Sequence, residues 1–529
     1  GHGLITNKSH WRQFPHVTNG KWHKDNIVLL GDSKATAHYS IGSGTKLAME
    51  CAIALSDAIV ESPNNITNAF ENYEKARRNR VEMIQYAANV SLDWFENMDR
   101  HMQHPFYQLS FGCMTRSKKV TFENLSIRDK SYTNKVLKEF NELNNEIENT
   151  PAAFSKFKLR DLELENRIVM SPMGQYSAEN GLANDWHLMH YGNRAIGGVG
   201  LIIAEMTAVS ETGRITLGCT GIYTKNQIVE WKKITDFIHK NSTSKIGIQL
   251  GHSGRKGATK KPWETEDLQN KWELLSASPI PFKNDAPTPK EMTLEDMDLV
   301  CSQFVQATIN ANEAGFDLIE LQAHHGFLLA SFLSPLTNIR TDEFGGSIEN
   351  RLKFPIRVFK AMREAFPQEK PMSVRISATD WAENGISEED VFKIANAFKN
   401  AGADIINVST GNTVANQKPQ VGRMWQTPFA DAVRNTVHIP TITTGYIQDI
   451  DQINTIILNG RADLVALGRP LLLDPNFVRN AQAYENYRAT DIPKQYMTGT
   501  SHLYPLKASE RKQTEGMKKA LKPESHKIK

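Results

Sequence analysis

Cysteine is scarce in this sequence, with four residues among 529: Cys51, Cys113, Cys219 and Cys301. No two of them have the C-x-x-C spacing of zinc or iron–sulfur ligands, and four scattered thiols do not build a disulfide framework. The sequence therefore argues against a metal centre and against an oxidising compartment. We expect reduced thiols in a cytoplasmic protein.

Long apolar runs and an excess of charge are also missing. No stretch approaches the roughly 18 uninterrupted apolar residues of a membrane span, and the N-terminus lacks the basic-then-apolar pattern of an export signal. The 62 basic and 59 acidic residues leave a formal charge of +3, which gives no reason to expect binding to nucleic acid or acidic lipid. A small molecule is the expected partner. The oligomeric state stays open, a homo-oligomer included.

No strand is followed by a G-x-G-x-x-G segment, the usual sign of an open, doubly wound dinucleotide-binding sheet. From about residue 154 to residue 484, short β-branched runs alternate with longer amphipathic segments. Eight strands with helical returns predict an α/β protein with a closed (β/α)8 TIM barrel rather than an open sheet. The expected strands are residues 167–173, 200–209, 245–250, 317–322, 372–377, 404–410, 440–445 and 463–468.

Pattern and composition divide the chain into three expected regions. Residues 1–150 begin with one apolar strand, NIVLLGD at 26–32, and continue through helical segments, which we interpret as a truncated domain. Residues 151–490 hold the barrel, and the alternating segment 154–167 should form a hairpin that closes its floor. Residues 491–529 should form a C-terminal extension ending in a flexible, lysine-rich tail.

Polar residues at the carboxyl ends of the expected strands are candidates for chemistry, because these ends meet at the mouth of a parallel barrel. The stretch LQAHHGF brings Gln322, His324 and His325 to the end of the fourth strand. A histidine at a strand end can instead be a hydrogen-bonded structural residue. Arg375 ends the fifth strand, where a cation would stabilise a flavin that becomes anionic on reduction. The alternative for Arg375 is an ion pair with a barrel carboxylate.

Glycines end the last two expected strands, Gly445 in TTGYI and Gly468 in LGRP. Turns at these two places commonly hold a phosphate through exposed backbone N–H groups. The sequence therefore predicts a phosphorylated cofactor at the barrel mouth.

Several motifs together resemble the old yellow enzyme family of FMN-dependent ene reductases. They are NRIVMSPMGQYSA, QLGHSGRK, ELQAHHGFLLASFLSPLTNIRTDEFGGSIENR, VRISATDW and NGRADLVALGRPLLLDP. Motifs at several strand ends are far more specific than one glycine pattern. The resemblance implies an FMN flavoprotein that takes hydride from NAD(P)H and passes it to an activated double bond.

The resemblance also assigns roles to single residues. The family's H-x-x-H or H-x-x-N pair, which polarises the substrate carbonyl, falls on Gln322 and His325. Its first histidine is replaced here by a glutamine, which carries no titratable proton. Many family members place a tyrosine proton donor where this chain has Phe327, which leaves Tyr176, His324 or water as alternatives. Tyr176 is also the expected substrate contact, with loop packing as its alternative. The residues expected around FMN are Ser171, Pro172, Met173, Gly174 and Gln249, with Arg375 at the N1/O2 edge and Gly445, Gly468 and Arg469 at the phosphate.

The segment NIVLLGDSKATAHYSIGSGTKLAMECAIALSDAI resembles the second flavin-binding motif of FAD-dependent aromatic hydroxylases. That resemblance implies that Asp32 accepts a hydrogen bond from a ribityl hydroxyl and that Gly42 and Gly44 present a helix N-terminus to the flavin. The alternative for Asp32 is a helix cap. Because the G-x-G-x-x-G segment for the ADP half is absent, the sequence argues against FAD. The order of the two parts resembles bifunctional salicylyl-CoA 5-hydroxylases and 2-aminobenzoyl-CoA monooxygenase/reductases.

Three hypotheses follow for function. The first is an FMN-dependent NAD(P)H oxidoreductase that reduces a C=C bond of an aromatic or enoyl CoA thioester. The second is an FAD-dependent hydroxylase acting with a missing N-terminal segment. The third is an inactive remnant, in which Gly174, Gln322 and Phe327 reflect lost catalysis. The flavin released from the protein distinguishes them.

Overall fold

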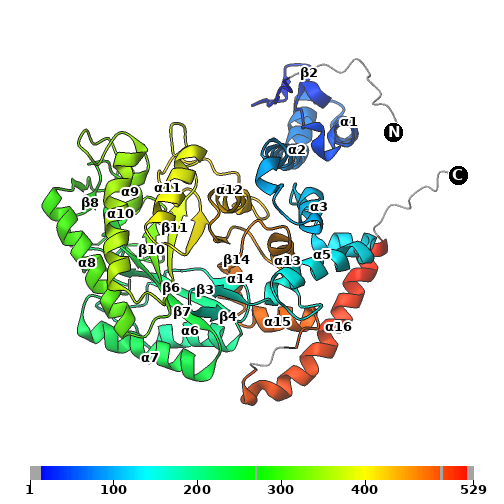
Figure 1. The fold of residues 1–529 in the computed structure, drawn as a ribbon. Helices are drawn as coiled ribbons and strands as arrows, with labels where there is room; N and C mark the ends of the chain where they lie inside the picture. Colours follow the sequence, from blue (N-terminus) through cyan, green and yellow to red (C-terminus); the bar gives the residue numbers. More distant parts are fainter. Residues whose placement is uncertain (1–12, 269–270, 489–491, 521–529) are drawn as a thin grey trace. The chain divides into compact units, whose positions relative to one another are not determined.

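The computed structural model describes residues 13–268, 271–488 and 492–520 (Figure 1). Within these ranges no helix is both long and apolar enough to cross a membrane. All four cysteines are free thiols.

The chain divides into two compact units, and we describe each by itself. The helices α4 (Phe122–Arg128) and α5 (Lys130–Leu143) belong to the same unit as the barrel, so that unit takes in more of the chain than the expected region 151–490. The first unit is Gly1–Gln103 with Cys113–Val120, and the second is His104–Gly112 with Thr121–Lys529.

The second unit contains a closed barrel of eight parallel strands, which confirms the predicted barrel. The order around it is β10-β11-β12-β13-β14-β5-β6-β7, and all eight expected segments contribute a strand. Nearly every residue of these strands is buried, as expected for strands covered on both sides. The strands are β5 (Ile168–Met170), β6 (Leu201–Ala208), β7 (Lys245–Gly251), β10 (Leu318–Ala323), β11 (Met372–Ser377), β12 (Ile405–Ser409), β13 (Thr441–Thr443) and β14 (Leu464–Leu467).

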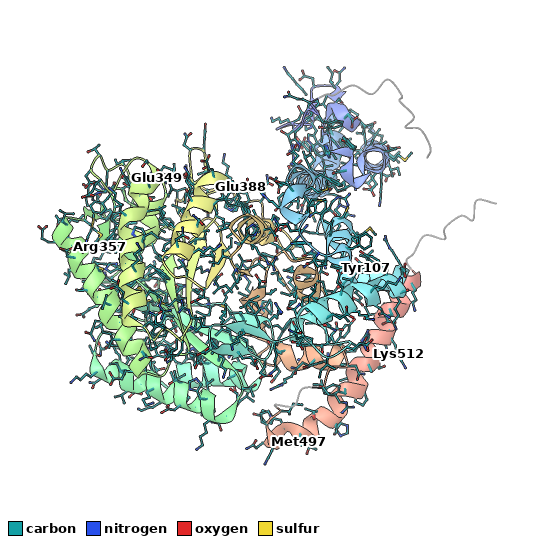
Figure 2. All side chains as sticks on the ribbon, viewed as in Figure 1. Tyr107, Glu349, Arg357, Glu388, Met497 and Lys512 are labelled. Atoms are coloured by element: carbon teal, nitrogen blue, oxygen red, sulfur yellow. The ribbon has the colours of Figure 1, made fainter. Side chains whose placement is uncertain are left out.

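Helices follow the barrel strands and cover the outside of the barrel (Figure 1). Local sequence fixes their starts, since the side chains of Thr224, Thr293 and Ser387 each accept a hydrogen bond from the backbone N–H three residues later. Glu349 and Glu388 lie in first turns, where a negative charge complements the helix dipole (Figure 2). The main helices are α6 (Asp185–Ile196), α7 (Lys225–Asn241), α8 (Leu294–Glu313), α10 (Ile348–Ala365), α11 (Glu388–Asn400), α12 (Thr427–Val437), α13 (Ile450–Leu458) and α15 (Phe477–Tyr484), with the short α9 (Leu328–Leu333) and α14 (Arg469–Leu473).

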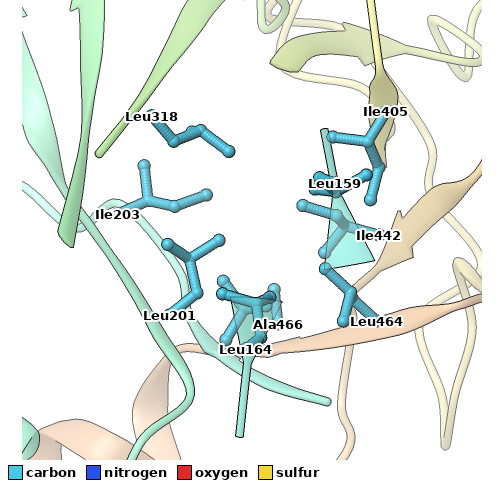
Figure 3. Packing of buried hydrophobic residues seen from close by; sticks show 10 residues of the cluster. Leu159, Leu164, Leu201, Ile203, Leu318, Ile405, Ile442, Leu464 and Ala466 are labelled. Atoms are coloured by element: carbon cyan, nitrogen blue, oxygen red, sulfur yellow. The ribbon is translucent and has the colours of Figure 1, made fainter. Parts of the chain in front are cut away.

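The amino ends of the barrel strands are closed by the predicted hairpin, which is confirmed. Strands β3 (Phe157–Leu159) and β4 (Leu162–Leu164) pair antiparallel. Leu159 and Leu164 are buried in one apolar cluster with residues of the barrel interior (Figure 3). Because this floor is filled by hydrocarbon, polar chemistry is left to the opposite, carboxyl end. The barrel members of the cluster are Val169, Leu201, Ile203, Leu318, Ile405, Ile442, Leu464 and Ala466.

The first unit has its own small core. The expected strand at 26–32 contributes only β2 (Ile27–Val28), which pairs antiparallel with β1 (His23–Lys24) and therefore does have a partner. Asp32 is exposed on a 3-10 turn, and it is not a helix cap because Leu30 holds that position. The helices α1 (Gly44–Glu61) and α2 (Ile66–Glu96) pack together around the core cluster, whose buried members include Trp22, Leu47, Cys51, Tyr73 and Val81.

The C-terminal region differs from the predicted flexible tail. Helix α16 (Met497–Ala520) covers much of it and packs on α15 and α4, whereas residues 521–529 lie outside the described part. The side chain of Tyr504 is buried, and its hydroxyl donates to the carbonyl of Tyr487 at 2.7 Å. Arg511 pairs with Glu515 one turn later. The flexible tail was predicted from the lysine-rich composition, which gives no sign of these anchoring contacts.

Glu485, the residue directly after α15, should make the stability of the protein depend on pH. Burial raises the pKa of Glu485 to about 7, although the charge of Arg511 lowers it. The negative charges of Asp451 and Glu123 add to the increase. A pKa raised by folding contributes stability at low pH that is lost as pH rises towards 7. We expect Glu485→Gln, which keeps an oxygen for the Asn454 amide, to raise stability at pH 8 by about 1–2 kcal/mol and to change it little at pH 5. Denaturant unfolding at both pH values tests this, and equal effects would contradict it.

Candidate active site

A buried carboxylate organises the polar interior above the apolar floor. Glu320 lies on β10 and is fully buried. It accepts hydrogen bonds from the Gln249 amide at 2.8 Å, the Ser373 hydroxyl at 3.1 Å and the Asn407 amide at 2.8 Å. Burial raises the pKa of Glu320, against the charge of Arg375 and these three bonds. Sequence analysis missed Glu320, although an acid two positions before Gln322 in an apolar strand must share its inward face.

Arg375 lies on β11 at the same level of the barrel as Gln322 on one side and Asn407 on the other. It is buried, and its Nη1 donates to the Ser171 hydroxyl at 3.3 Å, while its Nε has no hydrogen-bond partner among the described residues. Within the described residues it forms no ion pair, so the alternative of a barrel ion pair is not realised. Burial lowers the pKa of Arg375, and the charge of Glu320 opposes this. The guanidinium therefore keeps unsatisfied donor capacity inside the barrel.

The candidate carbonyl-binding pair lies at the carboxyl end of β10. The Gln322 amide donates to the Gln249 side-chain oxygen at 3.4 Å, and its own oxygen is buried without a partner in the part of the chain that the structure describes. His325 adopts a left-handed backbone conformation, with φ of +55°. Its Nε2 lies 2.7 Å from the Ser409 hydroxyl. Burial, and then the charges of Arg375 and Lys256, lower the pKa of His325, so its imidazole is neutral near pH 7.

The loop after β5 carries four further predicted residues. Tyr176 has φ of +51° and is half-buried, with its ring edge-on to Trp263 at 6.1 Å between centroids. A Cβ added at Gly174 would lie 3.0 Å from Cζ of Tyr176, so the small residue leaves room for this ring. Pro172 and Met173 precede it and are half-buried. Burial raises the pKa of Tyr176.

The two predicted phosphate turns follow neighbouring strands, since β13 pairs with β14. Gly445 has φ of +102°, and a Cβ there would lie 2.8 Å from Nε1 of Trp425, so the turn requires glycine. A Cβ at Gly468 would meet Sδ of Met173 at 3.5 Å. The end of the last strand and the end of the first therefore come together, as predicted. Arg469 is exposed, and its guanidinium lies 5.0 Å from the ring centroid of Tyr446.

The barrel region of the chain is similar to known proteins. The model of the NADH:flavin oxidoreductase / NADH oxidase family matches residues 153–487. NADPH dehydrogenase of Listeria monocytogenes serotype 4a (strain HCC23) is 42% identical over 345 residues, which are 65% of this chain and 97% of that protein. Morphinone reductase in complex with tetrahydroNAD is 25% identical, with a TM-score of 0.54 over 65% of this chain and 94% of that one. 2-Naphthoyl-CoA reductase is 22% identical and shares the fold with a TM-score of 0.57. The match covers 62% of this chain and 52% of that protein.

Proposed function

Since this chain belongs to the NADH:flavin oxidoreductase / NADH oxidase family, we propose that it reduces a C=C bond conjugated to a carbonyl. It is an FMN-dependent NAD(P)H oxidoreductase of the old yellow enzyme type. One observation carries this choice of acceptor. Gln322 and His325 lie at the carboxyl end of β10, buried or half-buried, beside Arg375, which forms no ion pair within the described residues. Hydrogen-bond donors fixed in a buried site are suited to a carbonyl oxygen that gains negative charge.

The residues of the barrel mouth fit FMN. Arg375 has a buried Nε without a partner, and Gln322 has a buried oxygen without one. Gly445 and Gly468 follow the neighbouring strands β13 and β14 and carry no side chain of their own, so their backbone N–H groups are candidates for binding a phosphate. When bound, FMN accepts hydride from NAD(P)H and returns it to the acceptor. We assign Arg375 to the N1/O2 edge of the flavin, Ser171, Pro172, Met173, Gly174 and Gln249 to the ring, and Gly445, Gly468 and Arg469 to the phosphate.

The chain's own residues bind and orient the acceptor. The Gln322 amide has two N–H groups, of which one reaches Gln249, and the other is left for the acceptor oxygen. Glu320 fixes the Gln249 amide and so sets which way the Gln322 amide faces. His325 stays neutral because burial lowers its pKa, so it stabilises the oxygen by hydrogen bonding and does not protonate it.

We propose an aromatic or enoyl CoA thioester as the natural acceptor. This choice is supported by the resemblance of most of the chain to bifunctional CoA-thioester hydroxylase–reductases. The CoA-thioester proposal is narrower than the proposal that the protein reduces a conjugated C=C bond. A simple enone would occupy the same carbonyl site, but it has no nucleotide part for the protein to bind.

An acceptor series tests both statements. We expect the purified protein to release FMN and to be reduced anaerobically by NAD(P)H. We expect 2-cyclohexenone, crotonyl-CoA and 2-aminobenzoyl-CoA to reoxidise it, with at least one thioester about tenfold faster than its free acid, a difference of about 1.4 kcal/mol. If no conjugated acceptor reoxidises it, the reductase assignment is wrong. If enones work and thioesters show no advantage, only the CoA part is wrong.

The resemblance of residues 1–150 to FAD-dependent aromatic hydroxylases stays a separate prediction. The motif around Asp32 supports it. FAD in the extracted flavin beside FMN would favour a second flavin site on these residues. FMN as the sole extracted flavin would favour the barrel as the only one.

A further inference from the structure

We propose that Lys256 is the proton donor of the reduction, a role that rests on the proposed function. Lys256 ends a 3-10 turn (Gly254–Lys256) that follows β7, so it lies at the same end of the barrel as the carboxyl end of β10. Its side chain is half-buried. The family's tyrosine donor is replaced here by Phe327, and a phenyl ring has no proton to give.

Two backbone carbonyls hold the Lys256 ammonium in place. Its Nζ donates to the carbonyl of His325 at 2.8 Å and to the carbonyl of Asn412 at 3.0 Å. An ammonium has three N–H donors, so one is left over. One of the two carbonyls is the backbone carbonyl of His325, so the ammonium contacts one member of the carbonyl-binding pair.

Two aromatic rings lie against the same ammonium, and one of them is Phe327. Nζ lies 4.3 Å from the ring centroid of Phe282 and 4.9 Å from that of Phe327. Both contacts are within the range of cation–π attraction. The proton of Lys256 therefore sits over the ring that stands in the tyrosine position.

The surroundings of Lys256 favour release of this proton. Burial, and then the charges of Arg255 and Lys283, lower its pKa to about 7. The nearby His324 and His325 bring no charge near pH 7, since burial lowers the pKa of both. Among the described residues no carboxylate pairs with Lys256. An acid with a pKa near the working pH transfers its proton most effectively.

The other candidates are weaker acids. Burial raises the pKa of Tyr176, which makes its hydroxyl harder to ionise. His324 has a buried Nδ1 without a partner, but burial holds its pKa well below the usual value, so the ring is neutral. A neutral imidazole is a poor proton donor compared with an ammonium near its pKa.

The step balances as follows. The carbon β to the carbonyl gains a hydride, which the reduced cofactor supplies, and the α carbon gains a proton from Nζ of Lys256. The π bond of the acceptor breaks and two C–H bonds form, so the acceptor is reduced and the cofactor is oxidised by two electrons. One N–H bond breaks and leaves Lys256 as a neutral amine, which water reprotonates.

Half-reaction kinetics of Lys256→Met test the proposal. We expect anaerobic reduction by NADPH to stay within about threefold of wild type and reoxidation by 2-cyclohexenone to fall about 100-fold, the size of a lost general acid. The wild-type reoxidation rate should fall above about pH 7, and the variant should lose this dependence. Adding Phe327→Tyr to Lys256→Met should restore most of the rate, whereas Lys256→Arg, which keeps the charge, should not.

A measurement on the protein without flavin complements the kinetics. Reductively methylated apoprotein, with Lys256→Arg to assign the signal, should show one lysine that titrates near pH 7 by NMR. A Lys256 signal that titrates near pH 10, or wild-type reoxidation by Lys256→Met, would overturn the proposal. Failure of the reductase function looks different, because wild-type enzyme itself would then not be reoxidised by any enone.

Discussion

Arg375→Ala will weaken FMN binding by about 100-fold and slow NAD(P)H oxidation. The expected loss corresponds to about 3 kcal/mol, the size of a charge-assisted hydrogen bond in a buried site. The guanidinium is buried, and no ion pair within the described residues uses it. Removing it leaves a reduced, anionic flavin without a compensating charge. Fluorescence titration of the apoprotein with FMN measures the affinity, and anaerobic mixing with NAD(P)H measures the rate.

Two further variants separate this role from general stability. Arg375→Lys keeps a positive charge but loses the planar fork, so we expect it to recover about tenfold of the lost affinity. Arg167→Ala is a matched control, because Arg167 is also buried but lies beside the floor hairpin, where its Nε donates to Ser155. It should cost stability and leave the affinity of the folded protein for FMN unchanged. Wild-type affinity and reduction in Arg375→Ala would refute the assignment.

The barrel was predictable because each strand can be recognised from its own short stretch of sequence. Each strand is a short apolar run bounded by turn residues and followed by an amphipathic helix. The eight runs can therefore be predicted without knowing which strands pair with one another. The floor hairpin at 154–167 was predictable for the same reason, from its alternation of polar and apolar residues. The C-terminal helix α16 was not, since its anchor depends on Tyr504 reaching the backbone of Tyr487.

The site residues were predictable only where the position of a residue along a strand determines whether its side chain lies at the barrel mouth. Gln322 and Arg375 follow from strand ends that must meet at one barrel mouth. The inward position of Glu320 could have been predicted in the same way, but its hydrogen-bond partners could not. No local pattern marks Lys256, because its role depends on contacts with distant segments. The partners of Glu320 come from three other strands, and Lys256 reaches a carbonyl of the loop after β12 at Asn412. Such contacts join segments that are remote in the sequence.

Replacing both Gln322 and His325 by alanine should slow reoxidation by 2-cyclohexenone about 1,000-fold. Each removes a donor to an oxygen on which charge develops, and one such donor is worth about 100-fold or more in rate. Reduction by NAD(P)H should stay within a few-fold of wild type, because it precedes binding of the acceptor. Stopped-flow absorbance of the two half-reactions separates these effects.

The single variant Gln322→His tests the same pair in the opposite direction. It restores the histidine of the family motif, and a neutral imidazole can also donate to the acceptor oxygen. In wild type the amide of Gln322 is oriented through Gln249 by the carboxylate of Glu320. We therefore expect Gln322→His to keep reoxidation within about tenfold of wild type, far above the double alanine variant. Equal loss in both would mean that the amide network, and not a donor at position 322, limits the reaction. Wild-type reoxidation by the double variant would show that the acceptor oxygen is held elsewhere.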